Sequence, residues 1–168
     1  ALVVDGGIPG ASDTLEFIST ESTADFEVLA GSSAHEGAVV MDGETTDFSA
    51  IETIQLNADD ISGSDTLAVS GTGQDDAFTL AADTGTDGGS LETSFGPDVI
   101  FADFGSDSTV SLNGGGGDDD FSATQAADWA ITTVNVDGMA PSNSDGFELI
   151  GTSGDDAVVY TPTASNGG

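Results

Sequence analysis

Short glycine-rich turns that end in acidic residues recur along this chain of 168 residues. Three of them align with one another, at residues 71–76, 114–119 and 151–156, and a degenerate fourth occupies residues 31–36. Successive turns begin about 40 residues apart, a spacing typical of proteins built from structural repeats. The sequence therefore predicts a single domain over residues 1–168, made of four sub-units that start near Gly31, Gly71, Gly114 and Gly151.

Alternating apolar and polar residues flank these turns, and this period of two predicts short β-strands. Before the turns, the apolar positions are Leu67/Val69, Val110/Leu112 and Phe147/Leu149; after them, they are Ala38/Val40, Phe78/Leu80, Phe121/Ala123 and Val158/Tyr160. A Ser-Asp pair precedes a strand at residues 12–13, 64–65, 106–107 and 144–145. Further strands are expected within 1–4, 49–56, 98–104 and 129–136. No stretch shows a helical period over the length of a helix, so we expect an all-β fold.

The repeat continues from the last residues of the chain into the first ones. We therefore expect one period of a tandem array, or a subunit that stacks head to tail; a self-contained domain is the alternative. The first choice of fold is a β-solenoid resembling a parallel β-helix, with about four irregular coils, because each repeat then buries its apolar face against a neighbour. The rival is an antiparallel Greek-key β-sandwich, which the unequal loops and an insertion near residues 19–26 favour.

Charge restricts the possible partners of this chain. It has 31 Asp and Glu residues, no Lys or Arg and one His, which gives a formal net charge of −31. Without cations it lacks the electrostatic attraction that draws proteins to nucleic acids and to anionic membranes. There is also no Cys, so disulfides and thiolate metal sites are excluded. Any buried carboxylate must bind backbone N–H groups, water or a metal ion.

Calcium is the metal that best matches these turns. It binds six to eight oxygen atoms from carboxylates, carbonyls and water, and adjacent Asp side chains repel each other unless a cation lies nearby. Simple soluble turns are the alternative explanation. We expect the Ser-Asp turns at the opposite end of a strand from the Gly turns, so that stacked neighbours complete each site. The candidate ligands are Asp65, Asp75, Asp76, Asp107, Asp118, Asp119, Asp145, Asp155 and Asp156.

Residues 113–121 resemble the calcium-binding nonapeptide of the RTX proteins, whose pattern is G-G-x-G-x-D-x-U-x. The other turns depart from it at Thr72, Gln74, Thr152 and Glu36. The repeats also occur once in about 40 residues rather than consecutively, so a standard RTX β-roll is not implied. The whole pattern is similar to Gly-Asp-rich repeats of very large bacterial secreted and surface proteins. This resemblance implies an extracellular, calcium-linked structural or adhesive role.

We therefore expect a structural subunit or repeat of an extracellular filament, surface layer or matrix, stabilised by Ca²⁺. The alternative is an adhesion or ligand-binding module of a large bacterial adhesin. A polysaccharide-active enzyme is a weaker hypothesis, because consecutive acids such as Asp118, Asp119 and Asp120 point to opposite faces of a strand. No enzymatic activity is expected. The expected partners are further copies of the chain and divalent cations, and the expected location is extracellular or at the cell surface.

Overall fold

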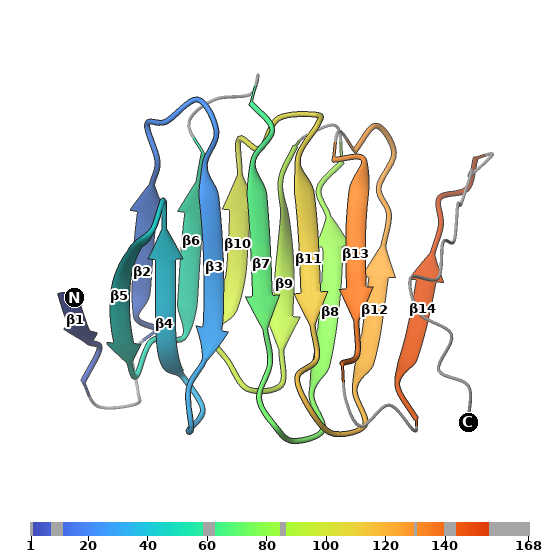
Figure 1. Cartoon of the computed structure of the whole chain (residues 1–168). Helices are drawn as coiled ribbons and strands as arrows, with labels where there is room; N and C mark the ends of the chain where they lie inside the picture. The colour runs from blue at the N-terminus through green and yellow to red at the C-terminus, as the bar shows by residue number, and fades with distance from the viewer. Residues whose placement is uncertain are drawn as a thin grey trace.

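The computed structural model describes residues 2–7, 12–58, 63–84, 87–129, 131–139 and 144–154. These residues form fourteen β-strands and no helix (Figure 1). The expectation of an all-β fold is confirmed. No helix suited to crossing a membrane is present in this described part of the chain.

Two seven-stranded sheets lie one behind the other (Figure 1). The front sheet has the order β1 (Leu2–Asp5), β5 (Glu44–Ser49), β4 (Glu36–Met41), β3 (Asp25–Ala30), β7 (Thr66–Ser70), β11 (Thr109–Asn113) and β13 (Thr133–Asp137). The rear sheet has the order β14 (Gly146–Ile150), β12 (Asp120–Thr124), β8 (Ala77–Ala82), β9 (Gly89–Thr93), β10 (Asp98–Ala102), β6 (Thr53–Asn57) and β2 (Thr14–Ile18).

The chain mostly crosses from one sheet to the other after each strand. We call one front-to-rear traverse of the two sheets a pass, and strands of successive passes pair in parallel. In the front sheet β7 pairs with β3 and β11; in the rear sheet β12 pairs with β8 and β14. Two segments instead stay within one sheet as antiparallel meanders, β3–β4–β5 and β8–β9–β10. Both sheets are therefore mixed, which an entirely antiparallel sandwich does not allow.

Residues 19–26, where an insertion is expected, form the connection from β2 to β3 and the first residues of β3. The two meanders lie mostly in later repeats, and each has three strands in one sheet where a simple crossing has one. Alternation of apolar residues marks a strand but does not say whether it crosses to the other sheet or turns back within its own. The expected strands within 1–4, 49–56, 98–104 and 129–136 correspond to β1, β6, β10 and β13. Val158 and Tyr160 lie outside the described residues.

Apolar side chains from the inner faces of both sheets form one core. Leu67 and Val69 of β7 and Val110 and Leu112 of β11 are all buried, as the alternation predicts. Phe78 stacks on Phe121 of the neighbouring strand, with ring centroids 4.9 Å apart. Burial of such side chains contributes about 1.5–3 kcal/mol each. Because the buried residues stack from strand to strand, each pass through the two sheets stabilises the next.

Candidate functional site

The glycine-rich turns at residues 71–76 and 114–119 lie along one edge of the structure, the lower edge in Figure 1. Gly151, whose turn the sequence aligned with them, instead follows the rear strand β14 at the opposite edge. The connections from β7 to β8 and from β11 to β12 lie at the lower edge, as do residues 138–139 after β13 and residues 144–145 before β14. An aspartate lies directly before the first residue of β8, of β12 and of β14: Asp76, Asp119 and Asp145. Because β8, β12 and β14 pair in register, these three residues are neighbours in space. We call them the Asp ladder.

Hydrogen bonds connect the members of the Asp ladder. The backbone N–H of Asp76 donates to Oδ1 of Asp119 over 2.9 Å, and the backbone N–H of Asp119 donates to Oδ1 of Asp145 over 3.0 Å. At the other end, the backbone N–H and the hydroxyl of Thr72 donate to Oδ2 of Asp76 over 2.6 and 2.9 Å. Each carboxylate thus holds a turn in place, and two of them link one pass of the chain to the next.

A glycine at the start of each turn makes room for the carboxylate at its end. A Cβ atom added to Gly114 would overlap with Oδ2 of Asp119, and one added to Gly138 would overlap with Oδ2 of Asp145. On Gly71 it would lie 2.7 Å from Oδ2 of Asp76. The repeated association of Gly and Asp in the sequence therefore has a packing cause as well as a conformational one.

Asp119 occupies the least favourable electrostatic position of the ladder. Its side chain is fully buried, and its Oδ2 has no hydrogen-bond partner in the described part of the chain. Burial raises the pKa of the Asp119 carboxyl, the hydrogen bond from Asp76 N–H lowers this pKa, and the negative charges of Asp76, Asp145 and Asp75 raise it. A proton or a cation at Oδ2 would relieve this arrangement.

The other candidate ligands are distributed over both edges. Asp75 and Asp118 are exposed beside the ladder, where the backbone N–H of Asp118 donates to Oδ1 of Asp75 over 3.0 Å. Asp107 is exposed at the opposite edge, where β11 begins. Asp155 and Asp156 lie outside the described residues.

Asp65 is a buried carboxylate with its own partners at that opposite edge. Its Oδ1 accepts the N–H of Ala24 over 2.7 Å, and its Oδ2 accepts the N–H of Gly105 over 3.1 Å. Its own N–H donates to the Ser108 hydroxyl over 2.8 Å. Backbone donors therefore satisfy this carboxylate without a metal ion.

The structure brings together a set of residues that the sequence alignment divided. The Ser-Asp pairs grouped Asp145 with Asp65 and Asp107, but Asp145 precedes a rear strand and joins the ladder, whereas Asp65 and Asp107 precede front strands. Sequence reasoning also missed Gly138, which pairs with Asp145 as Gly114 pairs with Asp119. Gly31, by contrast, lies in the hairpin between β3 and β4. The one available signal for Gly138 was its place directly after an alternating strand.

The described carboxylates of the Asp ladder and its neighbours do not by themselves form a complete set of metal ligands. Across the described ranges, no three His, Cys, Asp or Glu side chains converge as a group that could hold a metal ion. The unpartnered Oδ2 of Asp119 is the acceptor that fits a cation best; the exposed Asp118 is its neighbour in sequence, and the exposed Asp75 lies near it in space. Carbonyl groups of the turns would have to supply further oxygens.

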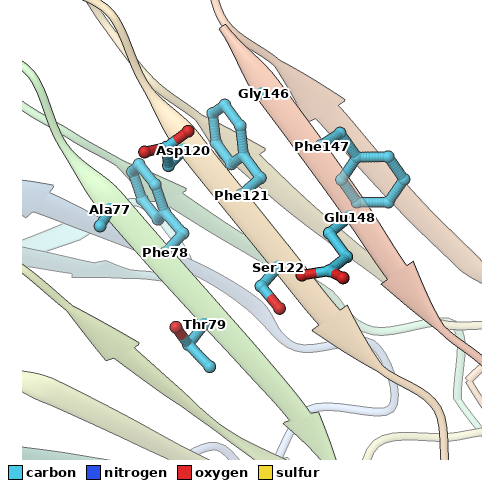
Figure 2. A pocket seen from close by; sticks show the side chains of 9 residues that line it. All are labelled: Ala77, Phe78, Thr79, Asp120, Phe121, Ser122, Gly146, Phe147 and Glu148. Carbon is cyan, nitrogen blue, oxygen red and sulfur yellow. The ribbon is translucent and has the colours of Figure 1, made fainter.

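A hollow of about 370 Å³ lies over β8, β12 and β14. Figure 2 shows the stacked rings of Phe78 and Phe121 on one side and Phe147 of β14 turned away from them. Asp120, Glu148, Ser122 and Thr79 also line the hollow. Phe78 and Phe121 belong to the buried core, at 1% and 3% exposed, so Phe147, which is 49% exposed, is the accessible ring of the hollow.

Comparison with known proteins finds no protein-family model, no curated protein and no solved structure that matches this chain.

Proposed function

We propose that this chain is a structural unit of an extracellular filament, surface layer or matrix, in which copies stack end to end and bound Ca²⁺ stabilises the turns. The observation that carries the proposal is the open-ended stack. In the described residues both sheets end in strands with one unpaired edge, β1 and β2 at one end and β13 and β14 at the other. Large apolar side chains are exposed at both ends.

The finer fold that supports this proposal is an irregular β-solenoid. Passes between the front and rear sheets pair in parallel with the preceding pass, and their inward residues stack. Each of the two meanders adds two strands to one sheet without ending the stack. Such a structure grows in one dimension, because each pass needs a neighbour on both sides to bury its apolar residues.

Calcium binding is supported by the Asp119 carboxylate. A buried oxygen without a donor costs about 1–3 kcal/mol or more when charged, and no Lys or Arg exists to offset it. The Asp ladder and the exposed Asp75 and Asp118 concentrate negative charge at this edge. When bound, Ca²⁺ would supply positive charge to these oxygens and raise the free energy of unfolding with the logarithm of its concentration.

Two measurements test this proposal on the full chain. Negative-stain electron microscopy at about 1 M NaCl, where the Debye length is about 3 Å, should show rods of uniform width. Thermal unfolding followed by circular dichroism should give a higher midpoint in CaCl₂ than in an equal concentration of MgCl₂. A monodisperse monomer under all conditions contradicts the filament, and equal midpoints in the two salts contradict specific calcium binding.

The hollow in Figure 2 favours adhesion as a second candidate function. The exposed ring of Phe147, together with the hydroxyl and carboxylate groups that line the hollow, suits the apolar faces and hydroxyls of a carbohydrate. A glycan array probed with labelled protein tests this function. Binding that disappears in Phe147→Ala while the melting temperature stays unchanged supports adhesion, and an array without signal counts against it.

A further inference from the structure

The first and last passes of the chain have the same orientation. Both go from the front sheet to the rear sheet, as β1 to β2 and as β13 to β14. In the front sheet every strand except β4 runs in the direction of β1, including β13. In the rear sheet every strand except β9 runs in the direction of β2, including β14. Figure 1 shows β1 and β13 pointing down and β2 and β14 pointing up.

The strand register shows that the two ends of the stack also correspond residue by residue. Following the pairings across the front sheet gives one row of side chains: Leu2, Thr46, Val39, Val28, Val69, Leu112 and Val136. The rear sheet gives a second row: Leu15, Ile54, Val99, Leu91, Leu80, Ala123 and Leu149. Leu2 and Val136 are as far apart in sequence as Leu15 and Leu149. A single translation along the stack therefore brings both rows of one copy into line with both rows of the next.

Exposure of the row ends indicates that these surfaces need a partner. The inner members except Thr46 are buried; Val28, Val69, Leu80 and Leu112 are at most 1% exposed. At the ends, Leu2 is 63% exposed and Leu149 39%. Val3, Ile18, Phe147 and Ile150 add to the exposed apolar area of the same end strands. Open, apolar edge strands pair readily with another chain.

We propose that the β13–β14 end of one copy binds the β1–β2 end of a second copy, so that both sheets continue as parallel pairs. In this interface β13 pairs with the second copy's β1, with Val136 beside Leu2, and β14 pairs with its β2, with Leu149 beside Leu15. Seven strands per sheet at about 4.8 Å give a repeat of about 34 Å along the filament. This interface rests on the proposed function only in requiring that copies assemble.

Charge adds a condition to this association. Asp137 and Glu148 lie on one end surface and Asp13 and Glu16 on the other, and no cationic side chain faces them. Like charges at the meeting surfaces repel over about 8 Å at physiological ionic strength. Stacking is therefore expected to strengthen as salt or a divalent cation screens the carboxylates.

Disulfide trapping tests the predicted register, because the natural chain contains no cysteine. Glu16 and Ile150 are outward residues of the same rear row, so their Cα atoms would lie about 5 Å apart across the interface, within the range of a disulfide. Mixing Glu16→Cys with Ile150→Cys under mild oxidation at about 1 M NaCl should give disulfide-linked dimers with one chain of each kind. Val3→Cys with Asp137→Cys is the equivalent pair for the front sheet.

The matched control mixes Glu16→Cys with Glu148→Cys, which moves one cysteine two residues along β14 on the same face. We expect its dimer yield to be at least tenfold lower. Equal yields, or efficient dimers from either single variant alone, would overturn the proposal, since the latter indicates symmetric contacts between like ends. Absence of any dimer would also overturn it and would mean that something else covers these ends. If the predicted dimers are trapped but the protein forms no rods, the interface is supported and the filament is refuted. If rods form without the predicted dimers, the filament is supported and this interface is refuted.

Discussion

Asp119 accepts a hydrogen bond of 2.9 Å from the backbone N–H of Asp76, although the two residues are 43 positions apart in the sequence. Only one of its two carboxylate oxygens is used in this way, and Oδ2 has no partner in the described part of the chain. The same carboxyl thus links two passes of the chain and carries an unsatisfied buried charge. This combination leads to the first two predictions.

Asp119→Asn should raise the melting temperature at pH 7 in the presence of a chelator. The amide keeps an oxygen for the N–H of Asp76 but removes a buried negative charge next to Asp76 and Asp145. The fold should remain, and any increase in melting temperature caused by Ca²⁺ should become smaller. Asp118→Asn, an exposed neighbour, is the control and should change the midpoint in chelator only slightly. A lower midpoint for Asp119→Asn in chelator would contradict this prediction.

The destabilisation caused by the ionised Asp119 carboxyl should become smaller as the pH falls. Its folded-state pKa is raised above the ordinary value of 3.8, so the folded protein binds this proton more readily than the unfolded chain. The penalty of the ionised carboxyl applies above the folded-state pKa, fades as the pH drops through it, and is absent below the unfolded-state value. In chelator, the advantage of Asp119→Asn over the natural protein should therefore shrink between pH 7 and pH 4. Denaturant unfolding at both pH values measures it; an advantage independent of pH would refute the assignment.

Gly114→Ala should destabilise the protein by about 1–3 kcal/mol, or prevent folding, because the new methyl group would overlap with the Asp119 carboxylate. Gly73 provides a matched control in the equivalent stacked turn, since a Cβ atom there has no heavy atom within 4 Å. Gly73→Ala should stay within about 0.5 kcal/mol of the natural protein. Urea unfolding of the two variants gives the comparison, and equal effects would show that the carboxylate does not occupy this space.

Asp65→Ala should cost about 2–5 kcal/mol, because it leaves the buried N–H groups of Ala24 and Gly105 without an acceptor. The loss should be the same with Ca²⁺ and with chelator, since backbone donors already satisfy this carboxylate. Asp107→Ala changes an exposed residue at the same edge and should cost less than about 0.5 kcal/mol. A loss for Asp65→Ala that appears only in the presence of Ca²⁺ would instead make Asp65 a metal ligand.

The strands and turns of this protein could be predicted from the sequence because they depend on local properties. Alternation of apolar residues at Leu67/Val69 and Val110/Leu112 marked β7 and β11, and glycine followed by aspartate marked the turns after them. The stacking of the turns that begin at Gly71 and Gly114 also follows from their alignment. The absence of Lys and Arg predicted that a buried carboxylate would bind backbone N–H groups, water or a metal ion, and Asp65 has backbone donors.

The tertiary structure alone decided which sheet each strand joins. β2, β7, β11 and β14 all follow a Ser-Asp pair, yet two lie in the rear sheet and two in the front sheet. An inward apolar residue looks the same in either sheet, and a meander such as β8–β9–β10 has the same alternation as a crossing pass. Pairing is settled by hydrogen bonds and packing between residues far apart in sequence, which no local pattern encodes. For that reason Asp145 joined Asp76 and Asp119, and the residue register at which the two ends of the stack correspond became visible only in the fold.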